Sequence, residues 1–135
     1  AATFIVTSMT DGVDTAPGDG FCTTAAATCT LRAAIQEANA LSGADSITLP
    51  ADTYVLNLFG AGEDAAATGD LDITGDLTIT GAPTGQTIVN AAGIDRVFDI
   101  FAPAAVTLAR LTIQNGNTSG ADVPVLPVAA PRVLP

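Results

Sequence analysis

Leu71-Asp72-Ile73-Thr74-Gly75-Asp76-Leu77-Thr78-Ile79-Thr80-Gly81 is the stretch that decides how this chain folds. It contains two triplets of the form apolar–polar–apolar, separated by a corner of small and polar residues. Side chains alternate between the two faces of a strand, so each triplet presents its two apolar side chains on one face. Residues 106–116 repeat the same pattern. The repetition predicts two copies of one unit, stacked so that equivalent apolar residues meet.

Short alternating segments of this kind continue through residues 45–116, and Gly, Asn, Pro or Asp separates most of them. Repeated triplets with corner turns are typical of a β-solenoid, whereas a β-sandwich, the alternative, normally uses longer strands. The sequence therefore predicts an all-β fold, a short right-handed parallel β-helix of about three coils. The segments are Ile47–Leu49, Tyr54–Leu56, Leu71–Ile73, Leu77–Ile79, Thr87–Val89, Val97–Ile100, Val106–Leu108 and Leu111–Ile113.

A helix over about residues 31–41 precedes these segments. Thr30 is a suitable N-cap, and Gly43 follows at the position where such a helix would end. Because the end of a β-helix exposes apolar cross-section, we expect the apolar face of this helix to cover the first coil near Ile47 and Leu49. That face consists of Leu31, Ala34, Ile35, Ala38 and Leu41, with Arg32, Gln36 and Glu37 away from it.

Composition and charge exclude several functions. The chain has 135 residues, of which 48 % are hydrophobic and 13 % charged, so it can bury a core. It has no lysine and a net charge of −10, which disfavours binding to nucleic acids or anionic lipid. Histidine is also absent, so no Ser-His-Asp or Cys-His arrangement can form.

Cys22 and Cys29 are the only cysteines. Without histidine they cannot complete a structural zinc site, and we expect them to form a disulfide; two buried free thiols are the alternative. A disulfide would place the protein outside the reducing cytosol, secreted or at the cell surface. The start at Ala1-Ala2-Thr3 is consistent with cleavage of a signal peptide. No apolar run is long enough to span a membrane.

Residues 118–135 are apolar and rich in proline, unlike the rest of the chain. The sequence therefore predicts two regions, a capped β-helix over residues 1–117 and an extended apolar tail over residues 118–135. Proline recurs through the tail, so it cannot form a helix or an interior strand. We expect the tail to contact a neighbouring protomer or another surface protein. Its assembly contacts would be Val123, Val125, Leu126, Val128, Val133 and Leu134.

The segment Cys29–Ala40, followed by Gly43–Pro50, resembles the initial segment of bacterial secreted right-handed parallel β-helix proteins. These include pectate-lyase-like surface proteins and polymorphic outer-membrane-type adhesins. The resemblance covers most of residues 3–117 and implies a fold and a secreted location. It implies no activity, because this fold is shared by lyases, hydrolases, adhesins and structural proteins.

Two groups of acidic residues are candidates for a site. Asp11, Asp14 and Asp19 lie in a glycine-rich loop and could bind Ca²⁺, although a plain Asp/Gly turn would look the same. In the family that the chain resembles, polysaccharide lyases use a cationic base opposite a cluster of carboxylates. Here Arg96 and Arg110 would be the bases, and the neighbouring acids are Asp72, Asp76, Asp95 and Asp99. We interpret these as surface residues and expect no enzymatic activity.

The sequence thus predicts a non-catalytic structural protein of the cell surface, which self-assembles into a filament or layer or docks on a partner. Its open coil end and its tail would make the contacts. The first alternative is an adhesin or a glycan-binding fragment, and the second is a degenerate polysaccharide lyase. No cofactor is expected; calcium in the acidic loop is the alternative that the sequence leaves open.

Overall fold

The computed structural model describes residues 2–41, 43–56, 71–92, 97–101 and 104–114. Nine strands and one helix lie in these ranges, and every expected strand overlaps an observed one. In chain order they are β1 (Thr3–Ile5), α1 (Leu31–Ala40), β2 (Asp45–Thr48), β3 (Thr53–Val55), β4 (Leu71–Ile73), β5 (Leu77–Thr80), β6 (Ile88–Asn90), β7 (Phe98–Ile100), β8 (Val106–Ala109) and β9 (Thr112–Gln114).

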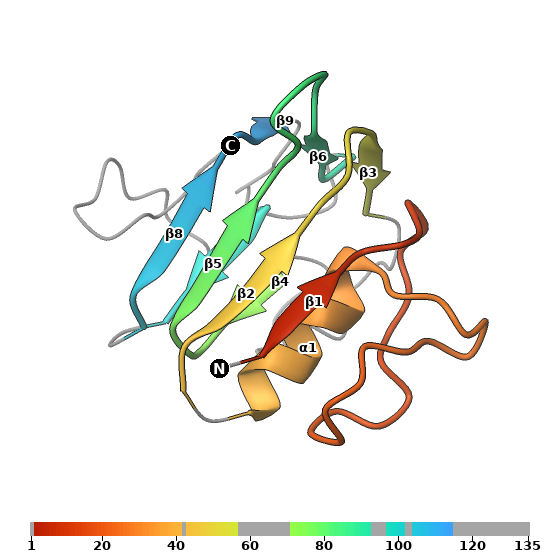
Figure 1. Cartoon of the computed structure of the whole chain (residues 1–135), viewed down its shortest axis with the longest axis vertical. Coiled ribbons are helices and arrows are strands. Elements are labelled where there is room, and N and C mark those ends of the chain that lie inside the picture. The colour runs from red at the N-terminus through yellow and green to blue at the C-terminus, as the bar shows by residue number, and fades with distance from the viewer. Residues whose placement is uncertain (1, 42, 57–70, 93–96, 102–103, 115–135) are drawn as a thin grey trace.

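The strands form three small sheets, and all pairings are parallel. The first sheet has the order β1-β2-β5-β8, the second β3-β6-β9 and the third β4-β7. From β2 onward the chain visits the first, second and third sheet in turn (Figure 1). From β2 onward, two other strands therefore lie in the sequence between strands that pair.

The expected fold class, an all-β right-handed parallel β-helix of about three coils, is wrong. The described residues combine three small parallel sheets with a helix, so the class is mixed α/β. The helix is part of the core and not an addition to it. Ala34 and Ile35 on α1 are 0 % exposed, and α1 contacts β2 and β4. The strand pattern alone could not reveal that a helix supplies one side of the interior.

The internal similarity between residues 71–81 and 106–116 also does not correspond to stacking. Leu71 on β4 pairs with Phe98 on β7, whereas Val106 on β8 pairs with Leu77 on β5. The similar segments thus begin in different sheets. The apolar–polar–apolar triplet is common to strands of all three sheets, so the pattern locates strands but does not identify their neighbours.

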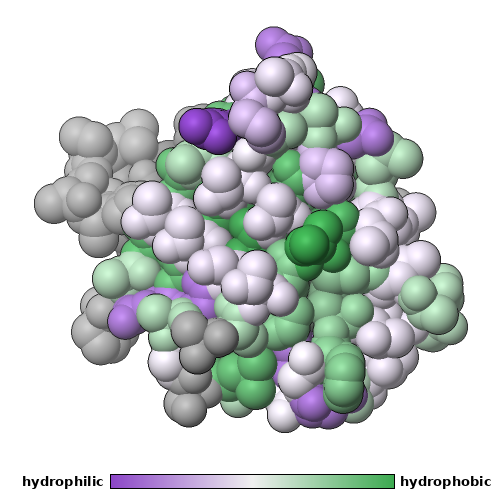
Figure 2. All heavy atoms as spheres, in the orientation of Figure 1, coloured by the Kyte–Doolittle hydropathy of each residue, from purple (hydrophilic) through white to green (hydrophobic). Residues whose placement is uncertain are grey.

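The core consists of the inward side chains of the three sheets. In the first sheet, Phe4, Ile47, Ile79 and Leu108 occupy one row across β1, β2, β5 and β8. One outward row of the same sheet is small and polar, with Thr3, Ser46, Thr78 and Thr107 in register. The next outward row has the exposed Ile5 on β1 beside Thr48, Thr80 and Ala109. Figure 2 shows that the face over this sheet is mostly pale, with one small strongly hydrophobic spot.

Helix α1 begins as expected. The Thr30 hydroxyl accepts a hydrogen bond from the Ala33 N–H at 3.0 Å, which satisfies one of the free N–H groups of the first turn. Leu31, Ile35 and Ala38 are buried, which confirms the predicted apolar face. Arg32 and Glu37, expected away from that face, are also buried, because the preceding loop covers the other side of the helix.

Residues 118–135 lie outside the described residues, and with them the division at residue 117 and the predicted assembly contacts Val123, Val125, Leu126, Val128, Val133 and Leu134. No helix in the described ranges is long and apolar enough to cross a membrane.

Candidate functional site

The loop between β1 and α1 carries the predicted disulfide. Cys22 and Cys29 are bonded, with their Cα atoms 5.1 Å apart. The Cys29 carbonyl accepts hydrogen bonds from the N–H groups of Thr7 and Ser8, at 2.8 and 3.1 Å. These hydrogen bonds join both ends of the loop next to β1, and the disulfide closes residues 22–29 within it. This arrangement fixes the position of the acidic residues between them.

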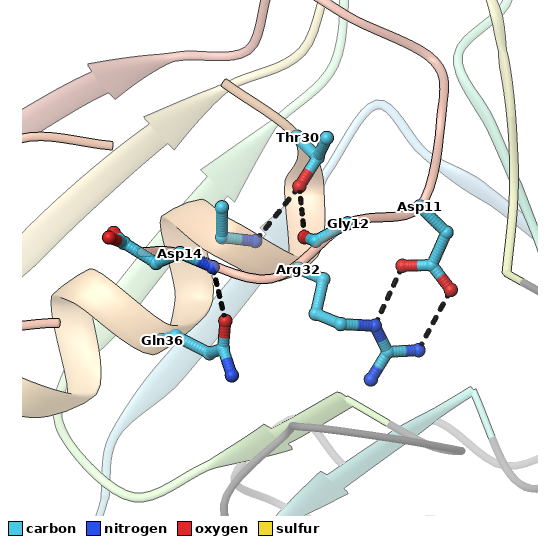
Figure 3. A network of polar contacts seen from close by, with 7 residues as sticks. Asp11, Gly12, Asp14, Thr30, Arg32 and Gln36 are labelled. Atoms are coloured by element: carbon cyan, nitrogen blue, oxygen red, sulfur yellow. Dashed lines mark hydrogen bonds and ion pairs between the residues drawn. The ribbon is translucent and has the colours of Figure 1, made fainter. Parts of the chain in front are cut away.

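Asp11 forms an ion pair with Arg32 and does not join the other acids of the loop. The Arg32 Nε–H donates to Asp11 Oδ1 at 2.7 Å, and Nη2 donates to Oδ2 at 3.0 Å (Figure 3). The two side chains are 1 % and 0 % exposed. The predicted role of Asp11 as a calcium ligand stays a prediction, although both of its oxygens bind the guanidinium group and it lies apart from Asp14 and Asp19.

Asp14 and Asp19 instead meet Glu37 of α1. One carboxylate oxygen from each of the three residues lies within 4.8 Å of the others. We call these three residues the acidic cluster. Asp14 and Glu37 are buried, whereas Asp19 is exposed. The cluster thus has two buried carboxylates and one at the surface, in the region that the prediction assigned to calcium.

Backbone groups hold the members of the acidic cluster in place. Glu37 Oε2 accepts hydrogen bonds from the N–H groups of Gly18 and Gly20, at 2.9 and 2.7 Å. Asp14 Oδ1 accepts one from Ala16 N–H at 2.9 Å, and Asp14 N–H donates to Gln36 Oε1 at 2.8 Å (Figure 3). Gly18 and Gly20 have φ angles of 100° and 89°, which only glycine adopts readily. The turn can therefore present both N–H groups to Glu37.

One oxygen of each buried carboxylate remains without a hydrogen bond, namely Asp14 Oδ2 and Glu37 Oε1. Burial raises the pKa of the Glu37 carboxyl, the hydrogen bonds from Gly20 and Gly18 lower it, and neighbouring Asp14 raises it again. The net direction of the pKa is upward, because burial disfavours the charged carboxylate more than the two backbone hydrogen bonds favour it, and the nearby Asp14 adds to the increase.

Sequence reasoning missed Glu37, because it placed this residue on the solvated side of the helix. Two features of the sequence favour the burial of Glu37 under the loop. The chain has no lysine, so a glutamate on α1 has few cationic partners. Meanwhile Gly18-Asp19-Gly20 offers two flexible backbone N–H groups, which favour a nearby carboxylate.

The outer edges of the first sheet are a second feature of interest. Within the described ranges, β1 and β8 each pair with a strand on one side only. A shallow groove of about 430 Å³ runs beside β1, lined by residues 2–5 and 7 and by residues 20–22 and 27–29. Ile5 and Phe21, both in the groove lining, are 62 % and 68 % exposed. Such large apolar side chains at an unpaired strand edge are typical of a contact surface.

The opposite end of the sheets, formed by β8 and β9, is less completely buried. Leu108 is half-buried although its neighbour Ile79 on β5 is 0 % exposed. Ile113 on β9 is likewise half-buried next to Val89, which is 0 % exposed. Core residues at this end therefore remain partly accessible.

The residues considered for lyase chemistry do not form a described site. Asp95 and Arg96 lie outside the described residues, and Asp99 is placed only by its register opposite Asp72. Arg110 is exposed, with a φ angle of 60°. Asp76 Oδ1 accepts a hydrogen bond from Ala105 N–H at 2.8 Å, which links the start of β5 to the start of β8.

No protein-family model matches the chain, and comparisons with curated proteins and with solved structures returned no significant match.

Proposed function

We propose that this chain is a non-catalytic structural protein that works outside the cytoplasm, and that its copies associate head to tail through the outer edges of the four-stranded sheet. The main observation behind this proposal is that β1 and β8 are the two outer strands of one parallel sheet. An unpaired edge offers a row of backbone N–H and C=O groups to another strand. The occupant of each edge would be a second copy of the chain.

Strand direction supports the head-to-tail arrangement. All four strands of the first sheet are parallel, so β1 of a second copy can add to β8 without a change of direction. The contact then uses different surfaces on the two copies. Repetition of such a contact extends the sheet from copy to copy and yields a filament unless the rotation closes a ring.

Apolar surface at both ends supports the same proposal. Ile5 and Phe21 are exposed beside β1, and Leu108, Leu111 and Ile113 are only partly buried at the β8–β9 end. Apart from Ile5 on the edge strand β1, the outward face of the four strands consists mainly of Thr and Ser. Association through the ends would bury more apolar surface and is therefore favoured.

The disulfide and the roles of the acidic residues support the remaining parts of the proposal. A bond between Cys22 and Cys29 is stable in oxidising compartments. Several carboxylates already have structural roles, since Asp11 pairs with Arg32 and Asp45 Oδ1 accepts from Ala2 N–H at 2.9 Å. The absence of histidine removes the most frequent general base. The predicted contact of residues 118–135 with a neighbouring copy remains part of this proposal.

Sedimentation velocity of the wild type and of two lysine variants tests the proposed association. Ile5→Lys places a charge on the outer edge strand, a common way to block strand addition. Met9→Lys is the control, because Met9 is 49 % exposed, lies off β1 and receives the same charge. We expect the wild type and Met9→Lys to form assemblies and Ile5→Lys to remain monomeric.

A wild type that stays monomeric at every concentration, or an Ile5→Lys variant that assembles like the wild type, would contradict the proposal and favour the adhesin or glycan-binding alternative. A variant that lacks residues 121–135 separates the two parts of the proposal. If it still assembles, the sheet edges are sufficient and the tail is not the connector.

A further inference from the structure

The acidic cluster differs from Asp11 in the same loop, because neither of the two arginines in the described part of the chain forms an ion pair with it. Glu37 is 0 % exposed and Asp14 is 6 % exposed. Each has one oxygen that accepts no hydrogen bond, Oε1 of Glu37 and Oδ2 of Asp14. Buried polar atoms in proteins are nearly always paired, and two buried carboxylates side by side are the costliest exception.

The hydrogen bonds already present show which interaction is missing. Glu37 Oε2 and Asp14 Oδ1 accept from backbone N–H groups, so the loop is built around the two carboxylates. These bonds hold the side chains in position, and no other described group donates to the remaining two oxygens. The two carboxyl groups lie close enough to each other to share a proton or to hold a cation. The nearby arginine, Arg32, binds both oxygens of Asp11.

We propose that Asp14, Asp19 and Glu37 bind one calcium ion, which fastens the loop to helix α1. The donor set consists of carboxylate oxygens alone, the ligands that hard divalent cations prefer. Two ligands on opposite sides of a calcium ion, at about 2.4 Å each, are at most roughly 4.8 Å apart. The three ligand oxygens of the cluster lie within 4.8 Å of one another, so one ion can reach all of them.

Calcium suits this geometry better than magnesium does. Magnesium requires ligands at about 2.1 Å in a nearly ideal octahedron, whereas calcium accepts longer distances and irregular arrangements. Three carboxylates from a turn and a helix form an irregular set, and exposed Asp19 leaves that side open to water ligands. The ion would also offset part of the net charge of −10. This inference concerns ion binding by the single chain and does not depend on the proposed association.

Isothermal titration with CaCl₂, after removal of bound metal with EDTA, tests the site. We expect one ion per chain with a dissociation constant on the order of 10⁻⁴ to 10⁻³ M, as in other extracellular calcium modules. Glu37→Gln and Asp14→Asn should weaken calcium binding by at least about tenfold, because even loss of an outer partner costs roughly 10–100-fold. MgCl₂ should bind more weakly than CaCl₂.

Asp52→Asn is the matched control, because Asp52 is exposed and lies outside the acidic cluster. It removes the same charge, so its calcium affinity should equal that of the wild type. Glu37→Gln keeps a carbonyl oxygen for the N–H groups of Gly18 and Gly20, and the fold should be retained. Asp19→Asn changes an exposed position and keeps the test valid if a buried substitution unfolds the chain.

Three results would overturn the inference. The first is a wild type that binds no calcium, which would mean that Asp14 and Glu37 share a proton between their carboxyl groups instead of binding an ion. The second is retention of wild-type affinity by both Glu37→Gln and Asp19→Asn. The third is an equal loss of affinity in Asp52→Asn, which would show that only the overall negative charge attracts the ion.

Discussion

The two ends of the four-stranded sheet carry the same kind of inward side chain but bury it to different degrees. At the β1 end, Phe4 and Ile47 are 7 % and 1 % exposed. At the other end Leu108 is only half-buried, although it stands in the same row. The two ends differ in what covers the inward side chains. Helix α1 contacts β2 and lies behind the β1 end of the sheet (Figure 1). An inward position is thus not sufficient for burial.

The largest expected change in the free energy of unfolding comes from placing an aspartate in the core at either end of the four-stranded sheet. Ile35→Asp removes a fully buried side chain and puts a carboxylate in the seam between helix and sheets, which should destabilise the fold by about 5 kcal/mol. Leu108→Asp, at the half-buried end, should cost less than about 2 kcal/mol. Urea unfolding followed by circular dichroism compares the two. Equal losses would show that the ends do not differ in the way described.

A second substitution tests whether the loop holds the covered end together. Arg32→Met leaves Asp11 buried without its guanidinium partner and should lower the free energy of unfolding by about 3–5 kcal/mol. Arg110→Met removes the same charge from an exposed position and should change it by less than about 0.5 kcal/mol. The same urea experiment measures both. If Arg32→Met unfolds like Arg110→Met, the buried ion pair does not stabilise this end.

A smaller, pH-dependent effect is expected at Tyr54 on β3. Burial raises the pKa of the Tyr54 hydroxyl, with a further increase from Asp52. The folded state therefore holds this proton more tightly than the unfolded state. Its contribution to stability is present below the ordinary tyrosine pKa of about 10 and is lost as the pH rises through the folded value. Tyr54 is the only tyrosine and the chain has no tryptophan, so ultraviolet absorbance reports its ionisation alone.

Tyr54→Phe provides the matching variant. It removes the hydrogen bond that the Tyr54 hydroxyl donates to the Pro50 carbonyl at 2.7 Å, which should cost about 1 kcal/mol at neutral pH. The loss of stability above about pH 10 should be smaller in this variant than in the wild type. A wild-type tyrosine that titrates at its ordinary pKa would contradict the burial of this side chain.

The sequence predicted features that depend on neighbouring residues. Triplets such as Leu77–Ile79 located the strands, Thr30 marked the start of the helix, and the Cys22–Cys29 disulfide was confirmed. Features that depend on distant contacts were missed. Sheet membership could not be read, because strands of all three sheets share one pattern. Glu37 was assigned to solvent, because nothing in a helical pattern shows that a loop will cover its polar side.

Cross-linking between copies tests the proposed association most directly. Thr3 on β1 and Thr107 on β8 occupy one outward row of the first sheet, with Ser46 and Thr78 between them. If β1 of one copy adds to β8 of the next and continues this row, Thr3 comes to lie beside Thr107 of its neighbour. The Cα atoms of paired parallel strands are about 4.8 Å apart, within the range of a disulfide.

A mixture of Thr3→Cys and Thr107→Cys chains, oxidised gently, should therefore give a covalent dimer that neither variant gives alone. Thr78→Cys mixed with Thr3→Cys is the control, because Thr78 already has a strand of its own chain on both sides. The account predicts dimers only in the first mixture, as measured by non-reducing electrophoresis and intact mass. Absence of that dimer while the wild type still assembles, or equal amounts in the control mixture, would contradict pairing of β8 with β1.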